Sequence, residues 1–291
     1  MSIAGGHERA IQRGAAIGCT AIQMFTKSSN QWAARPLTEE GVNLFKEEHA
    51  RSGIGPIVAH DSYLINLCSP DDALWRRSID ACSEELGRCA RLGIPWLVAH
   101  PGGHMKQGEE YGIGRMAEAI DTIHSRVPAA SASLALETTA GQGTILGYRF
   151  EQLGDLIGRT AEPDRIGVCL DTCHVFAAGY ELRTRAAYEE TFQRFDDLIG
   201  LHRLKAIHVN DSKKDLGCRV DRHEHIGRGS IGLEAFRFLM NDPRLLEVPL
   251  LLETPKGEDC REDVENITTL FRLVEKPARR AASSPTRRAR A

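Results

Sequence analysis

Short apolar runs that end in a histidine, an aspartate or a glutamate recur along this chain. Continuous runs of four or five apolar residues are typical of strands buried on both faces, and such strands belong to parallel sheets covered by helices. Six runs follow this pattern: IVAH ending at His60, LVAH at His100, LALE at Glu137, VCLD at Asp171, AIH at His208 and LLLE at Glu253. A seventh apolar run, AIQMF at 21–25, is followed by the polar loop TKSSNQW.

Helical patterns lie between these runs, whose starts are roughly 35 to 45 residues apart. The clearest helical patterns cover residues 71–92, 112–127, 185–201 and 233–240. Repeated strand–helix units with this spacing favour a parallel sheet with right-handed crossovers. The sequence therefore predicts an α/β fold, a TIM-type (β/α)8 barrel.

The first strand of that barrel is missing from the pattern. An eight-stranded barrel needs one strand more than the seven runs supply, and the chain opens directly on a helical pattern at 7–17. Either the barrel closes imperfectly, or the assigned translation start lies a few residues downstream of the real one. We favour the second explanation and expect the first strand to be truncated in this chain.

Charge divides the chain into two parts. The last sixteen residues, KPARRAASSPTRRARA, carry six basic residues and no acidic one, so removing their +6 from the net charge of −3 leaves −9. The composition of this tail cannot bury enough apolar surface to fold. We expect one barrel domain over residues 1–275 and a basic, disordered tail over 276–291.

Cellular location is constrained by what the sequence lacks. No stretch approaches the roughly 20 consecutive apolar residues that span a bilayer, and the first ten residues do not resemble a secretory signal. The eight cysteines are scattered without a CxxC pair, which is typical of reduced thiols. We therefore expect a cytoplasmic protein, a monomer without a membrane partner.

The polar residues that end the runs are candidate metal ligands. Strand carboxyl ends form the active-site face of α/β barrels, so these side chains are expected to converge. The motif DTCH adds a second ligand after its strand, and VDRHEHIGRG adds two residues whose spacing of two places both on one side of an extended loop. The nine candidates are His60, His100, Glu137, Asp171, His174, His208, Asp221, His223 and Glu253.

Nine nitrogen and oxygen ligands exceed what one tetrahedral ion can use and match two or three ions. Mixed imidazole and carboxylate ligation suits zinc best, with manganese or iron as substitutes. Such a cluster is suited to phosphodiester hydrolysis, which needs no organic cofactor. No P-loop or dinucleotide fingerprint stands at a strand end, which weakens nucleotide-dependent alternatives.

Several long motifs resemble those of bacterial endonuclease IV: HDSYLINL, HPGGH, LETTAGQG, DTCH, HVNDSKKDLGCRVDRHEHIGRG and LLLETP. The resemblance extends from the first residues of the chain to about Val274. The resemblance implies a zinc-dependent endonuclease of base excision repair. Such an enzyme cuts DNA 5′ to an abasic (AP) site to leave a 3′-hydroxyl, and it also removes blocked 3′ ends. The implied partner is double-stranded DNA that carries either kind of damage.

The resemblance also implies how three Zn²⁺ ions are shared among the ligands. One ion is held by His60, His100 and Glu137, with Glu137 bridging to a second. The other ligands of the second ion are Asp171, His208 and Glu253, and those of the third are His174, Asp221 and His223. Glu137 and Glu253 are the implied catalytic residues, which orient the nucleophile.

DNA-contacting loops follow from the same resemblance. The loops FTKSSNQW and DSYLINL are expected to enter the minor groove, with Tyr63 holding the duplex open while the abasic nucleotide is extruded. On the first loop we expect Lys27 and Asn30 to contact DNA. Asn30 stands where some family members carry an arginine that inserts into the base stack, so that wedge is weaker or replaced here.

Two alternatives belong to other classes of function. A two-metal sugar isomerase of the same barrel type uses mainly carboxylate ligands, and would need neither the DRH loop nor five histidines. A catalytically silent binder of damaged DNA would not need the complete ligand set.

Overall fold

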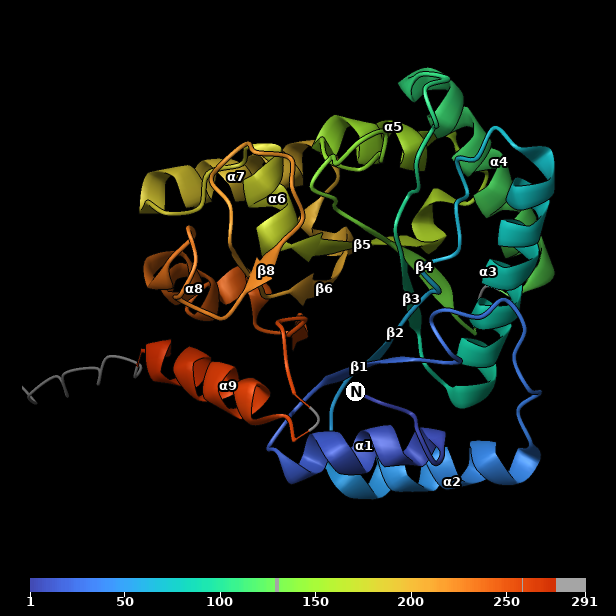
Figure 1. Cartoon of the computed structure of the whole chain (residues 1–291), viewed down its shortest axis with the longest axis horizontal. Helices are drawn as coiled ribbons and strands as arrows, with labels where there is room; N and C mark the ends of the chain where they lie inside the picture. Colours follow the sequence, from blue (N-terminus) through green and yellow to red (C-terminus); the bar gives the residue numbers. More distant parts are fainter. Residues whose placement is uncertain (129–130, 258, 276–291) are drawn as a thin grey trace, which may run out of the picture.

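Parallel strands alternate with helices along the chain, as the sequence pattern predicts (Figure 1). The computed structural model describes residues 1–128, 131–257 and 259–275. Within these residues, seven parallel strands form one sheet. They are β1 (Ile22–Phe25), β2 (Ile57–His60), β3 (Trp96–Ala99), β4 (Ser133–Glu137), β5 (Ile166–Asp171), β6 (Leu204–His208) and β9 (Leu250–Leu251).

The sheet curls into a barrel with one open seam. Neighbouring strands pair in the order β1-β2-β3-β4-β5-β6-β9, so β1 and β9 are its two edges. Among the described residues no strand pairing joins these two edges. This arrangement confirms the predicted α/β barrel of seven strands and locates the opening between the first strand and the last.

Helices cover the outside of the sheet (Figure 1). They are α1 (His7–Ala16), α2 (Glu39–Ser52), α3 (Asp72–Leu92), α4 (Glu109–Arg126), α5 (Phe150–Arg159), α6 (Thr172–Ala178), α7 (Arg185–Leu198), α8 (Leu233–Met240) and α9 (Arg261–Leu273). Short 3-10 turns cover Pro163–Arg165, Leu201–Arg203 and Pro243–Leu245. In the part of the chain that the structure describes, no helix is both long enough and apolar enough to cross a membrane.

Helix ends differ slightly from the predicted ranges. The helix predicted to begin at residue 112 begins at Glu109, where two glutamates in the first turn interact favourably with the helix N-terminus. The helix predicted to reach residue 201 ends at Leu198, and Gly200 (φ 94°) has left the helical conformation. The predicted tail, 276–291, lies outside the described residues.

Two apolar layers follow from the alternation of side chains along each strand. One side of the sheet packs against the helices and contributes residues such as Ile57, Leu97 and Leu134. The other side fills the barrel with one small cluster, which consists of Val58, Val98, Ala135, Cys169, Ala206 and Leu251. Ala21 of the segment before β1 packs against the same cluster.

Candidate metal centre

The strand-end residues converge because they share the inward side of the barrel. Each of the six lies two positions beyond a member of the interior cluster, as His60 does beyond Val58 and Glu137 beyond Ala135. With a side-chain period of two, all six point into the same end of the barrel. Glu137, Asp171 and His208 have no solvent exposure at all.

Glu137 is the centre of the group. One carboxylate oxygen lies 3.1 Å from Nε2 of both His60 and His100. The other lies 3.0 Å from Nδ1 of His208 and 3.2 Å from Nδ1 of His174. Four imidazoles from different strand ends therefore meet at one carboxylate.

The DTCH motif turns directly from strand into helix. Asp171 ends β5, and its carboxylate accepts a 2.9 Å hydrogen bond from the backbone N–H of His174, so it is the N-cap of α6. This cap places His174 in the first turn, with Nε2 3.2 Å from Asp221. The sequence motif thus brings the two ligands from one strand end to adjacent places.

The predicted ligands Asp221 and His223 lie on a hairpin made by β7 (Asp211–Ser212) and β8 (His223–Glu224), which pair antiparallel. His223 Nε2 lies 3.3 Å from one oxygen of Asp221 and 3.6 Å from Asp171. Glu253 joins the group 3.3 Å from Nδ1 of His208, so all nine predicted ligands lie in one continuous cluster.

The Nδ1 atoms of three histidines are held by backbone carbonyl groups. His60 Nδ1 donates to the carbonyl of Asp61 at 2.9 Å, and His174 Nδ1 donates to that of Thr138 at 2.8 Å. His223 Nδ1 donates to the carbonyl of Glu253 at 3.1 Å. Because a carbonyl oxygen only accepts, each bond leaves Nε2 facing the carboxylates, the orientation that metal-ligating histidines require.

The electrostatics of the cluster suit a cation. Burial opposes protonation of His60, but the carboxylates of Glu137 and Asp61 outweigh it and raise the pKa of His60 to about 9. Burial likewise opposes ionisation of Glu137, yet His208 and His100 hold the pKa of this carboxyl well below its usual range. For Asp221 the same balance, with His174 dominant, lowers the pKa to about 2.

One buried nitrogen supports metal binding directly. Among the described residues, His223 Nε2 is one of the few buried side-chain atoms without a hydrogen-bond partner, although it faces two carboxylates. A buried imidazole nitrogen in this state is costly unless something else occupies its lone pair. The donor set of imidazole nitrogens and carboxylate oxygens therefore fits divalent metal ions.

The ligand atoms form overlapping groups, within each of which all atoms lie within 4.8 Å of one another. Two groups coincide with predicted sets: His60, His100 and Glu137, and Glu137, Asp171, His208 and Glu253. The third region is divided: Asp171 joins His174 and His223 in one group, while Asp221 joins His223 and Cys173 in another. Burial raises the pKa of the Cys173 thiol to about 12, so this thiol is a weak ligand.

Two supporting residues were not among the predicted ones. Asn210 donates to Asp171 at 2.6 Å and accepts the backbone N–H of Glu253 at 2.9 Å, which ties β5 to the segment after β9. The Asp211 carboxylate is fully buried and accepts backbone N–H groups from the loop after His223. The sequence offered a signal for Asn210 only, because it stands two positions beyond His208 and therefore on the same side.

The predicted DNA-contacting residues are placed differently from one another. Tyr63 is 60% exposed and lies beside His60 (ring centroids 5.8 Å apart), and Asn30 is also exposed. Lys27 is buried, by contrast, and its ammonium lies 3.2 Å from the carboxylate of Glu85 on α3. The same ammonium donates to the carbonyls of Gln31 and Trp32, so Lys27 links its own loop to α3. The DNA contact of Lys27 stays a prediction.

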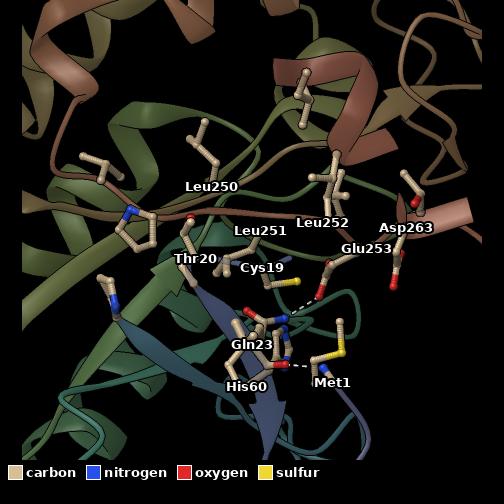
Figure 2. Close-up of a pocket in the computed structure, with 18 of the residues that line it drawn as sticks. Met1, Cys19, Thr20, Gln23, His60, Leu250, Leu251, Leu252, Glu253 and Asp263 are labelled. Carbon is tan, nitrogen blue, oxygen red and sulfur yellow. Dashed lines mark hydrogen bonds between the residues drawn. The ribbon is translucent and has the colours of Figure 1, made fainter. Parts of the chain in front are cut away.

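A cavity of about 1050 Å³ opens beside the cluster. Its lining includes Tyr63 and six of the nine ligands: His60, His100, His174, Asp221, His223 and Glu253. It continues along the open seam between β1 and β9, where Figure 2 shows Gln23 opposite Glu253. A molecule that enters the cavity therefore meets atoms of the candidate metal ligands.

A profile of the xylose isomerase-like TIM barrel family matches residues 11–270. The chain is therefore a barrel of this class, with a multi-metal centre proposed at its strand ends. Among its relatives, the "Probable endonuclease 4" of Chloroflexus aurantiacus is 51% identical over 275 residues, which cover 94% of this chain and 96% of the relative. The "Probable endonuclease 4" of Geobacter sulfurreducens is 52% identical over 285 residues, 98% of this chain and 96% of the relative.

A solved structure leads to the same family. The crystal structure of endonuclease IV from Thermus thermophilus has a TM-score of 0.82 and 36% identity, covering 94% of this chain and 96% of that one. The chain belongs to the endonuclease IV family. This confirms the resemblance stated from the motifs.

Proposed function

We propose that this chain is a metal-dependent AP endonuclease, which hydrolyses the DNA phosphodiester 5′ to an abasic site and leaves a 3′-hydroxyl. The observation that carries the proposal is the gathering of four imidazoles around the buried carboxylate of Glu137, in a chain of the endonuclease IV family. The relatives named endonuclease 4 favour this activity over the sugar isomerase alternative. Repair of blocked 3′ ends is part of the same proposal.

We assign three zinc ions to the centre, with manganese or iron as substitutes. His60, His100 and Glu137 would hold the first, and Glu137, Asp171, His208 and Glu253 the second. His174, Asp221 and His223 would hold the third. Bound ions of this kind make water a stronger nucleophile at neutral pH and neutralise the charge on phosphoryl oxygens.

The residues of the chain then have separate tasks. Glu137 is positioned by four imidazoles and can orient the attacking water from a fixed place. Glu253, which follows the edge strand β9, contacts His208 of the same group. Tyr63 is exposed and lines the cavity, and Asn30 is exposed on the loop after β1, so both can contact the extruded nucleotide or its duplex. Extrusion costs least at a nucleotide without its base, which favours damaged sites.

The test is incision of a labelled duplex that carries one abasic site. We expect metal-dependent nicking on the 5′ side, no nicking of the undamaged duplex and recovery of activity when zinc is returned after chelation. Sugar turnover without nicking would refute the proposal in favour of an isomerase. Binding of the damaged duplex without cleavage, in the presence of zinc, would indicate a silent binder instead.

A further inference from the structure

Gln23 occupies the position on β1 that corresponds to the ligands of the other strands. In six strands, the residue two positions beyond a member of the interior cluster is a proposed metal ligand. In β1 that relation links Ala21, which packs against the interior cluster, to Gln23. The first strand therefore contributes an amide to the layer to which the others contribute imidazoles and carboxylates.

Both ends of the Gln23 amide are bonded to proposed ligands of one ion. Its Nε2 donates to a Glu253 oxygen at 2.6 Å, a bond that crosses the open seam (Figure 2). Its Oε1 lies 2.7 Å from Nε2 of His208. A carboxylate requires a donor, so the amide nitrogen faces Glu253, and the amide oxygen must then accept the N–H of His208.

This bond determines which nitrogen of His208 is free. With the proton on Nε2, the lone pair of Nδ1 faces three carboxylates, and the closest oxygens of Glu137 and Glu253 are 3.0 and 3.3 Å away. The Nδ1 atoms of His60, His174 and His223 are held by backbone carbonyl groups, which a side-chain substitution does not remove. His208 is held through its Nε2, and by a side chain.

We propose that Gln23 is a positioning residue of the metal centre, which fixes His208 in the tautomer that ligates through Nδ1 and holds Glu253 across the seam. The inference rests on the proposed function in one respect, namely that the cluster binds metal. Removing a partner of this kind lowers metal affinity by about 10- to 100-fold. The loss is expected at the ion shared by His208 and Glu253, with the other ions unaffected.

The test compares Gln23→Met with Gln12→Met in the full chain. Methionine keeps the length of the side chain and removes the amide, so packing is preserved while both hydrogen bonds are lost. Gln12 on α1 is the matched control, since it donates to Glu48 at 3.2 Å and contacts none of the proposed ligands. Zinc affinity is measured by competition with a chelator, and the proton position on His208 by ¹⁵N NMR of the zinc-loaded protein.

We expect Gln23→Met to release one class of zinc about 10- to 100-fold more readily and to populate both tautomers of His208. We expect Gln12→Met to match the parent chain, and excess zinc to restore the incision rate of the Gln23 variant. Parental zinc affinity with a single His208 tautomer in Gln23→Met would overturn the inference.

Two further outcomes keep the test decisive. If Gln23→Met does not fold, the parent chain still tests the inference, because a proton on Nδ1 of His208 in the zinc-loaded protein would overturn it. If the zinc-loaded parent does not incise abasic DNA, the proposed function fails, while the affinity and tautomer measurements still decide the role of Gln23.

Discussion

Asp211→Asn is expected to destabilise the loop that follows the proposed ligand His223. The Asp211 carboxylate is fully buried and accepts five backbone N–H groups at 2.8 to 3.4 Å. The donors are Ser212 and Ile231 on one oxygen, and Gly227, Gly229 and Gly232 on the other. An asparagine whose oxygen serves the three glycines turns its NH₂ group toward the other two donors. Each lost bond to a charged acceptor costs about 1.5–3 kcal/mol, so the substitution should lower the free energy of unfolding by about 3–6 kcal/mol.

Urea unfolding followed by circular dichroism measures this loss, with Asp215→Asn as the control. Asp215 is exposed and accepts a single 3.3 Å hydrogen bond from Ser230, so its substitution should change stability by less than about 0.5 kcal/mol. Zinc analysis of the folded Asp211 variant should show weaker binding at the set that includes Asp221 and His223. A loss below about 1 kcal/mol for Asp211→Asn would refute the reasoning, because it is less than the about 1.5–3 kcal/mol expected for even one hydrogen bond to a charged group.

Three other expectations concern the site and its support. Glu253→Gln should keep the fold but lower abasic-site incision by about 100- to 1000-fold, as when one group that stabilises developing charge is removed; incision at the parental rate by a metal-loaded variant would contradict this. The pKa of His60 without metal is about 9, and a histidine must be neutral to bind a metal ion, so zinc binding at pH 7 should release a proton. This release should fade above pH 9. Calorimetry in two buffers of different ionisation enthalpy detects the proton, and its absence at pH 7 would count against His60 as a ligand. Glu85→Ala leaves the buried ammonium of Lys27 without its carboxylate, with only the carbonyls of Gln31 and Trp32 as partners, and should lower the free energy of unfolding by about 3–5 kcal/mol. Amide exchange in residues 26–35 should be faster; unchanged melting and exchange would show that the Lys27–Glu85 pair does not hold the loop.

The strand ends could be predicted because two local rules coincide there. A buried parallel strand is a continuous apolar run, and its carboxyl end lies at the face where ligands gather. Each of the six runs therefore indicated both an element and its candidate functional residue, as in IVAH, where Val58 fills the barrel and His60 faces the cavity. Gln23 was missed because it lies inside its apolar run instead of ending it, and glutamine is not a typical metal ligand. Its role becomes visible only when the interior cluster shows which side of β1 faces inward.

Lys27 shows the limit of inference from a loop sequence. A lysine in a polar loop is expected to be exposed, and the resemblance suggested a DNA contact. Its side chain is instead buried, and its ammonium lies 3.2 Å from the carboxylate of Glu85 on α3, almost sixty residues away in the sequence. The local sequence cannot predict this partner, because Glu85 of α3 comes close to the loop only in the folded barrel.

The loop after His223 is likewise held by a residue that is distant in the sequence. The spacing of Asp221 and His223 predicted that both would face one side, and the hairpin confirms that they lie together. What holds that hairpin could not be predicted, since Asp211 acts on N–H groups that come 16 to 21 residues later. Gly229 belongs to the same arrangement: a Cβ there would collide with the Asp211 carboxylate and the Ser212 carbonyl, so the backbone can approach Asp211 only as glycine. Gly229 is therefore expected to tolerate substitution no better than the proposed ligands, although it touches no proposed ion.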